Sequence, residues 1–153
     1  YSFKFAGSPH LASKLENKKI DKNKIKDAYK NLQNKFESVL VESSGGVLVP
    51  YNAKDFMIDI AKELNMPVIL VVLNKLGAIN HTLMSLESLE KRNIKIKGII
   101  FNNQCDENKT ILEDNIKIIK TISKIEILGS IDYCLDKEKL KNDFKEIGVK
   151  LCK

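Results

Sequence analysis

Four short runs of apolar, often β-branched residues alternate with amphipathic segments, and this alternation limits the folds open to the chain. Such runs are typical of strands in a parallel sheet, whereas apolar residues repeated every three or four positions indicate helices. The expected strands are 39–42, 67–73, 94–101 and 125–128, and the expected helices are one starting at Ser8-Pro9, then 21–36, 53–64, 78–92, 108–123 and 136–147. Because no hairpin signal separates the strands, the sequence predicts an α/β fold with a mainly parallel sheet flanked by helices.

Length and charge describe one ordinary globular domain. The chain of 153 residues is long enough to bury a core, so we expect residues 1–153 to form a single α/β domain. The net charge of +6 comes almost wholly from lysines, which are interleaved with acids and have no aromatic stacking platform beside them. This pattern indicates a solvated surface and argues against nucleic-acid binding.

The cysteines and the longest apolar run indicate where such a chain would work. Cys105, Cys134 and Cys152 show no C-x-x-C spacing, which argues against a disulfide framework or a zinc site and fits a reducing compartment. The longest apolar run, 67–73, is far too short to span a bilayer. We therefore expect a cytoplasmic protein with no membrane partner.

The stretch 39–50, V-L-V-E-S-S-G-G-V-L-V-P, is the clearest candidate for chemistry. It places Glu42 at the carboxyl end of an expected strand, which is the edge where parallel sheets bind ligands. The small serines and glycines at 43–46 allow the backbone to approach a phosphate or substrate closely. A carboxylate beside phosphates is a natural Mg²⁺ ligand, directly or through water. The alternative interpretation is a strand end with a surface acid and a glycine turn.

Two nucleotide-binding motifs are missing from the chain. Neither G-x-x-x-x-G-K-[ST] nor a G-x-G-x-x-G after a strand occurs in it. The 153 residues therefore contain no phosphate-binding loop of their own. A nucleotide enzyme read from these residues alone would be incomplete.

Several segments, taken in order, resemble dethiobiotin synthetase. They are Y-S-F…S-P-H-L-A-S, the 39–50 stretch, P-V-I-L-V-V-L-N-K-L-G-A-I-N-H-T-L and G-I-I-F-N-N, and the match runs in register from Tyr1 to about Leu135. The string K-L-G-A-I-N-H at 75–81 is the most distinctive. The resemblance implies a P-loop NTPase-like fold in which the first strand, the P-loop and the catalytic lysine would precede Tyr1. The chain then matches only the carboxyl-terminal two-thirds of the family and holds no catalytic residue.

The resemblance implies an ATP- and Mg²⁺-dependent ligase of biotin synthesis. In that reaction 7,8-diaminononanoate takes up CO₂ as a carbamate, ATP phosphorylates the carbamate, and the second amine closes a cyclic urea. Such chemistry depends on phosphate clamping, metal and positioning more than on a protein nucleophile. In the family the active site lies at a homodimer interface, so a second copy is the expected partner. We expect the chain alone to be inactive.

Residue roles follow from the family motif, position by position. The implied ATP contacts are Glu42, Ser43, Ser44, Gly45, Asn102, Asn103, Asp132, Tyr133 and Cys134, with Glu42 also the metal ligand. The implied substrate contacts are Ser8, Gly45, Gly77, Ala78, Ile79 and Asn80. An Asn amide suits a purine edge, and free N–H groups at a helix start suit a carboxylate. The departures from the family are Ser43-Ser44 for Gly-Ala, Asn103 for a frequent Asp, and Asp132 for a usual Pro.

Structural explanations exist for two of these segments, and a second function stays open. Helix capping explains Ser8 as well as substrate binding does, and the alternative interpretation of 77–80 is a strand-to-helix turn with a glycine. The alternative function is a non-catalytic binding or regulatory domain of the same fold that lacks the P-loop. A P-loop upstream in the same reading frame would favour the synthetase.

Overall fold

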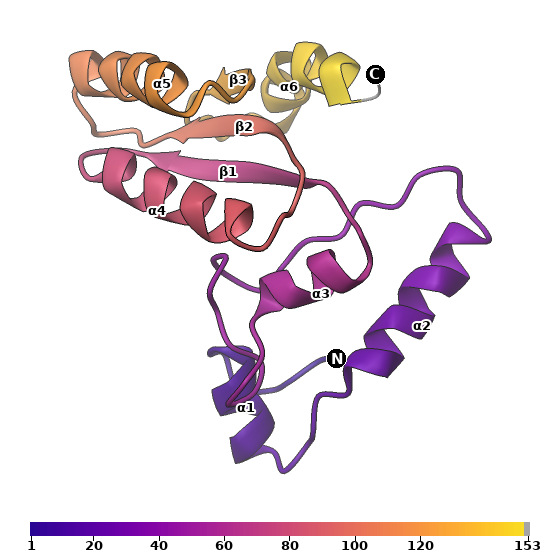
Figure 1. Cartoon of the computed structure of the whole chain (residues 1–153). Coiled ribbons are helices and arrows are strands. Elements are labelled where there is room, and N and C mark those ends of the chain that lie inside the picture. Colours follow the sequence, from indigo (N-terminus) through magenta and orange to yellow (C-terminus); the bar gives the residue numbers. More distant parts are fainter. Residues whose placement is uncertain (152–153) are drawn as a thin grey trace. The chain divides into compact units, whose positions relative to one another are not determined.

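The computed structural model describes residues 1–151, which form three strands and six helices (Figure 1). The chain divides into two compact units. The first is Tyr1–Met66 with Arg92–Ile94, and the second is Pro67–Lys91 with Lys95–Lys153. The single domain expected from the sequence stays a prediction. No helix in the described part of the chain is long and apolar enough to cross a membrane.

A parallel sheet forms the centre of the second unit. β1 (Val68–Asn74), β2 (Ile96–Asn103) and β3 (Ile127–Ile131) lie side by side in chain order. Asn74 lies opposite Asn103 in the β1–β2 ladder, so the carboxyl ends of these strands share one edge of the sheet. The predicted α/β class with a mainly parallel sheet is confirmed.

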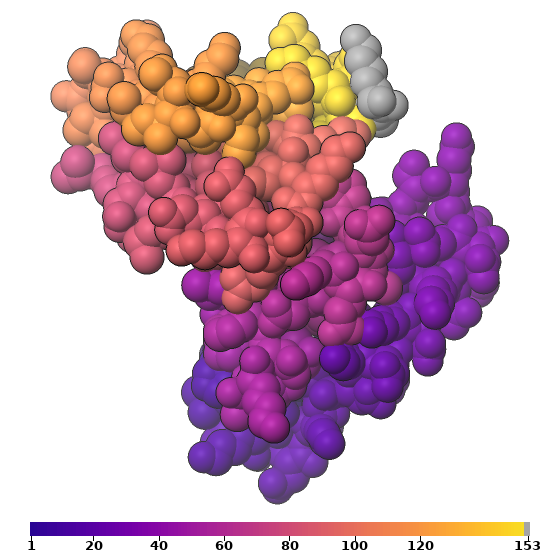
Figure 2. Space-filling model, viewed as in Figure 1, coloured from indigo at the N-terminus to yellow at the C-terminus, as the bar shows by residue number. Residues whose placement is uncertain are grey.

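Helices pack on both faces of this sheet. They are α4 (Ala78–Glu90), α5 (Lys109–Ser123) and α6 (Lys137–Leu151). Leu86 of α4 and Ile119 of α5 are buried with Phe101 on one face. Ile147 of α6 is buried against Leu128 on the other. The space-filling view shows side chains closing the spaces between these ribbons (Figure 2), as burial of one apolar face per helix requires.

The first unit holds three short helices around a small core. They are α1 (Pro9–Leu15), α2 (Lys22–Gln33) and α3 (Met57–Glu63). Ile20, Tyr51 and Ile60 are buried together. The Glu63 carboxylate accepts a hydrogen bond from Lys22 Nζ at 2.8 Å, which links α3 to the start of α2. This unit therefore depends on few buried residues.

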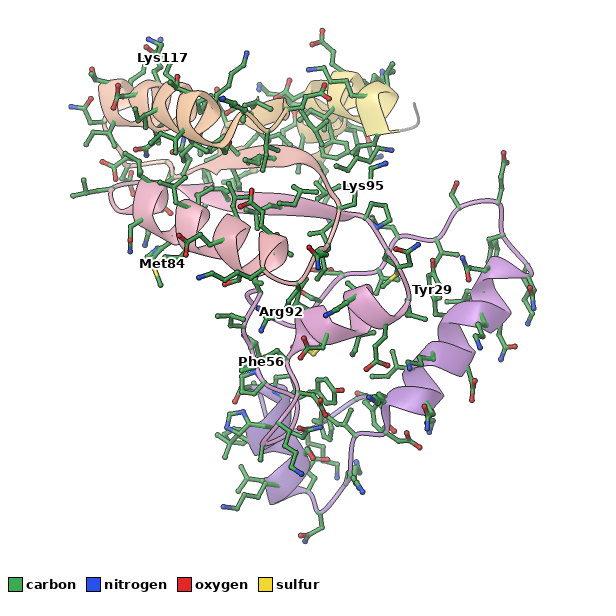
Figure 3. All side chains as sticks on the ribbon, in the orientation of Figure 1. Tyr29, Phe56, Met84, Arg92, Lys95 and Lys117 are labelled. Atoms are coloured by element: carbon green, nitrogen blue, oxygen red, sulfur yellow. The ribbon has the colours of Figure 1, made fainter. Side chains whose placement is uncertain are left out.

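Arg92 and Lys117 illustrate two different environments of cationic side chains (Figure 3). In the first unit, the Arg92 guanidinium carbon lies 5.7 Å from the centre of the Phe56 ring, and Arg92 Nε donates to Asp59 Oδ1 at 3.2 Å. In the second, Lys117 extends outward from α5 into solvent. The outward lysine agrees with the solvated lysine surface expected from the composition.

The strand expected at 39–42 does not form, so that prediction is wrong. These residues have no regular structure, and the Leu40 side chain is 88% exposed. An extended segment becomes a strand only when a neighbouring strand accepts and donates its hydrogen bonds. None of the described strands pairs with this segment. The described residues therefore form a three-stranded sheet, not the expected four strands.

Two helices of the first unit are shorter than expected. α2 ends at Gln33 rather than at residue 36, and Phe36, which lies beyond its end, is 59% exposed. α3 begins at Met57 rather than at residue 53. The cause is a turn in which Asn52 Oδ1 accepts from the Asp55 N–H at 2.8 Å, because an Asn side chain of this kind competes with helical bonding.

Candidate functional site

Polar side chains gather where β2 and β3 end. Asn103, the last residue of β2, donates from Nδ2 to Asp132 Oδ1 at 2.7 Å. Asp132 comes directly after β3. Parallel strands bring their following loops to one edge, which explains the contact. A pocket of about 190 Å³ opens here, and its further lining includes Gln104, Cys105, Leu112 and Tyr133.

The other residues predicted at this edge differ in position. Asn102 and Tyr133 are exposed, and Tyr133 lines the pocket. Cys134 does not line it, and its thiol lies 3.5 Å from the Asp136 carbonyl oxygen. Cys105 and Cys134 are free thiols, while Cys152 lies outside the described residues. The structure therefore brings Asn103, Asp132 and Tyr133 together at one pocket.

Two buried asparagines behind Asn103 were not predicted from the sequence. Asn74 is 0% exposed and donates from Nδ2 to Asn103 Oδ1 at 2.8 Å and to the Leu112 carbonyl at 3.0 Å. Asn115 is 4% exposed and donates from Nδ2 to Asn74 Oδ1 at 2.8 Å and to the Lys75 carbonyl at 3.0 Å. One signal could have identified them, because Asn74 ends an otherwise apolar strand and Asn115 lies on the apolar face of α5, one turn before Ile119.

The turn before α4 has the form expected of an anion site. Gly77 has φ of 90°, a conformation that glycine adopts without strain. The N–H groups of Gly77, Ile79 and Asn80 have no hydrogen-bond partner among the described residues, whereas that of Ala78 donates to the Lys75 carbonyl at 3.0 Å. Unpaired N–H groups at the start of this 13-residue helix favour an anion.

Glu107 holds this turn from a neighbouring loop, and the sequence analysis missed it. Its Oε2 accepts from the Leu76 N–H at 2.7 Å, and its Oε1 accepts from the Asn108 N–H at 3.0 Å. These two backbone bonds, with Lys75 nearby, lower the pKa of Glu107 from its ordinary value of 4.5. Its carboxylate is therefore ionised at neutral pH and fixes the residue before Gly77.

The predicted metal and phosphate loop at 42–46 belongs to the first unit and is open to solvent. Glu42 is exposed and has no partner within residues 1–151. Ser43 Oγ donates to the Gly45 carbonyl at 3.0 Å, and Gly45, not Ser43, takes the positive φ of 86°. Serines in place of the family's Gly-Ala are thus compatible with this backbone.

Glu42 is a single carboxylate and does not by itself build a complete metal site. No group of three or more His, Cys, Asp or Glu side chains in the described residues is placed to hold a metal ion. Mg²⁺ commonly binds one or two carboxylates and takes its other ligands from phosphates and water. A free carboxylate in a serine- and glycine-rich loop fits that form of binding.

Ser8 begins α1, as expected, but its hydroxyl does not make the cap. The Ser8 carbonyl accepts from the N–H groups of Leu11 and Ala12, both at 3.0 Å. No side-chain hydrogen bond caps the helix. Capping therefore accounts for the backbone of Ser8 and leaves its hydroxyl without that structural role.

Comparison with known proteins identifies the family. A profile of the AAA domain family matches residues 1–139. The chain belongs to this family. The P-loop NTPase-like fold class expected from the sequence is therefore confirmed, with a parallel sheet and flanking helices as described above.

Curated relatives of this AAA domain carry the name ATP-dependent dethiobiotin synthetase. The protein from Clostridium acetobutylicum is 42% identical over 99% of this chain, and that from Fusobacterium nucleatum is 39% identical over 98%. The protein from Clostridium perfringens is 40% identical over 92% of the chain. The chain spans 63%, 64% and 63% of the lengths of these three relatives.

Proposed function

We propose that this AAA domain is the carboxyl-terminal two-thirds of a dethiobiotin synthetase, which uses ATP and Mg²⁺ to form dethiobiotin from 7,8-diaminononanoate and CO₂. The observation that carries the proposal is an identity of 42% maintained over 99% of the chain with a synthetase of that name. The enzyme would work in the cytoplasm as a homodimer.

The edge formed by β2 and β3 is assigned to the nucleotide base. Asn103 uses one N–H on Asp132 and one carbonyl lone pair on Asn74, and so keeps one donor and one acceptor for a purine edge. Asn102, Tyr133 and Cys134 complete the proposed base contacts. Asp132 supports this role by holding the Asn103 amide at the mouth of the pocket.

The loop at 42–46 is assigned to the phosphates and the metal. Glu42 would hold Mg²⁺, which supplies charge neutralisation when the γ-phosphoryl group is transferred. Ser43, Ser44, Gly45 and Gly46 leave room for phosphate or substrate oxygens because they lack bulk.

The turn before α4 is assigned to the substrate carboxylate. The unpaired N–H groups of Gly77, Ile79 and Asn80 would receive it, beside the buried Ala78. Glu107 fixes the start of this turn, because its carboxylate accepts the hydrogen bond of the Leu76 N–H and does not bond the N–H groups after it. In the proposed homodimer this turn serves the active site of a second copy, and Ser8 borders the substrate amines.

The proposal is tested by expressing the whole reading frame that encodes this chain beside the 153-residue chain. Both are supplied with ATP, Mg²⁺, bicarbonate and 7,8-diaminononanoate, and dethiobiotin is measured by mass spectrometry. We expect product from the whole reading frame and none from the 153-residue chain, which has no P-loop motif to clamp phosphates. Absence of product from both, with ATP bound by the longer protein, would instead favour a non-catalytic nucleotide-binding domain.

A further inference from the structure

We propose that Asn74 and Asn115 are positioning residues that lock the Asn103 amide in one orientation, so that the pocket prefers 6-aminopurines to 6-oxopurines. This inference rests on the proposed role of Asn103 in binding the base. Its basis is a chain of hydrogen bonds that runs from Asn115 through Asn74 and Asn103 to Asp132, which we call the amide relay.

The ends of the amide relay determine its direction. At the inner end, Asn74 Nδ2 also donates to the Leu112 carbonyl, and Asn115 Nδ2 also donates to the Lys75 carbonyl. At the outer end, Asp132 Oδ1 accepts from Asn103 Nδ2. Carbonyl and ionised carboxylate oxygens accept and do not donate, so all three amides can be satisfied in one arrangement.

A rotation of the Asn103 amide by half a turn would break this arrangement. Its oxygen would then face the Asp132 carboxylate, and its NH₂ group would face the NH₂ group of Asn74. Asn74 has no solvent-accessible surface, so water does not compensate for the lost bonds there. Donor facing donor in such a buried position is costly, and the relay therefore excludes the rotated form.

The orientation matters because the two classes of purine present opposite patterns. Adenine offers an amino donor at position 6 beside a ring-nitrogen acceptor. Hypoxanthine offers a carbonyl acceptor beside an N–H donor. A freely rotating amide pairs with either pattern, whereas an amide held in one orientation discriminates between them.

The buried end of the relay contributes more to the lock than the exposed end. Asp132 is exposed, so water competes for its hydrogen bond to Asn103. Asn74 and Asn115 are shielded from water and held by backbone carbonyls. Removal of Asn74 should therefore release the Asn103 amide even though Asp132 remains.

The test compares adenosine and inosine as ligands of the wild-type chain, Asn74→Leu and Asn115→Leu, by calorimetric titration. Leucine keeps the branching and the number of side-chain heavy atoms but removes the amide. We expect the wild type to bind adenosine at least about tenfold more tightly than inosine, and Asn74→Leu to reduce that ratio at least about fivefold. Asn115→Leu, one bond further from the base, should reduce it less and replaces Asn74→Leu if that variant does not fold.

Thr82→Val is the matched control. Thr82 is 2% exposed and its hydroxyl donates to the Ala78 carbonyl at 2.7 Å, so valine removes one buried hydrogen bond outside the relay. The adenosine-to-inosine ratio should stay at the wild-type value. A ratio unchanged in both Asn variants, or lowered equally in Thr82→Val, overturns the proposal.

A second measurement does not depend on ligand binding. The side-chain NH₂ protons of Asn74 and Asn115 should exchange with deuterium at least about tenfold more slowly than those of exposed Asn102, as measured by nuclear magnetic resonance. Equal exchange rates overturn the relay. Equal binding of adenosine and inosine to the wild type overturns base selection alone, whereas binding of neither overturns it together with the proposed nucleotide site.

Discussion

Glu107 shapes a turn to which it does not belong. It bonds the N–H of Leu76, one residue before Gly77, and the N–H of Asn108, at the start of α5. A carboxylate held by two backbone donors is stabilised in its charged form, which is why the pKa of Glu107 is lowered. Glu107 does not bond the N–H groups of Gly77, Ile79 and Asn80, which remain available for the proposed substrate carboxylate.

Glu107→Gln should lower the free energy of unfolding at pH 7. Because the folded pKa of Glu107 lies below its ordinary value of 4.5, its stabilisation is present above that value and is lost as pH falls through the lowered pKa. The difference between wild type and variant should be full at pH 7 and should close as the pH drops below 4.5. Urea unfolding across this range measures it.

Glu113→Gln is the control for this substitution. Glu113 is an exposed acid on α5 whose ion pair with Lys109 has a nitrogen–oxygen distance of 3.8 Å. Such surface pairs contribute little to stability, so its replacement should leave the pH profile unchanged. A Glu107→Gln difference that persists undiminished at pH 3 would contradict the assigned cause.

At the scale of elements, α6 depends on a close approach to β3. A Cβ atom added at Gly129 would overlap the side chain of Ile147, whose Cδ1 would lie 2.5 Å away. Ile147 is 3% exposed and packs with Leu128 and Ile100. The absence of a side chain at residue 129 therefore allows the helix to cover this face of the sheet.

Gly129→Ala should destabilise the protein by about 1–3 kcal/mol, because the added methyl group overpacks the contact between α6 and β3. Gly148→Ala, in α6 itself, is the matched control, since a Cβ at Gly148 would meet nothing within 4 Å. That change should stabilise α6 by about 0.5–1 kcal/mol. Chemical denaturation compares both variants, and equal effects would disprove the packing argument.

At the scale of the whole molecule, β1 is an edge strand with an open apolar face. Within the described residues it pairs with β2 alone. Val71 is 63% exposed and Leu73 is 48% exposed, and Leu40 in the unpaired 39–42 segment is exposed as well. An edge of this kind is a template for pairing with other chains.

The 153-residue chain should therefore self-associate, and Val71→Lys should raise its monomer fraction at equal concentration. A charge on an edge strand opposes pairing between strands. Met84→Lys is the control: Met84 is 59% exposed and points outward from α4 (Figure 3), which presents no open strand edge. Sedimentation velocity measures the effect. A wild-type monomer with a sharp, reversible melt would refute the prediction.

Local signals in the sequence determined most elements of the second unit. Apolar runs predicted β1, β2 and β3, and the expected helix at 108–123 agrees with α5, where the Asn108 side chain accepts from the Thr110 N–H at 2.8 Å. Periodicity and caps act over one or two turns of chain, so they can be read without knowledge of the fold. Gly77 before α4 was predicted on the same local ground.

Only the tertiary structure decided which distant groups meet. The 39–42 segment is also an apolar run, yet it forms no strand, since it pairs with none of the strands in the described residues. Asn103 and Asp132 are 29 positions apart, and Asn74 and Asn115 are 41 apart. Their contacts depend on the parallel alignment of the strand ends and the packing of α5 on the sheet, which no local pattern contains. The sequence by itself determined the strand and helix types, while the amide relay exists because the folded sheet excludes water around polar groups that then bind one another.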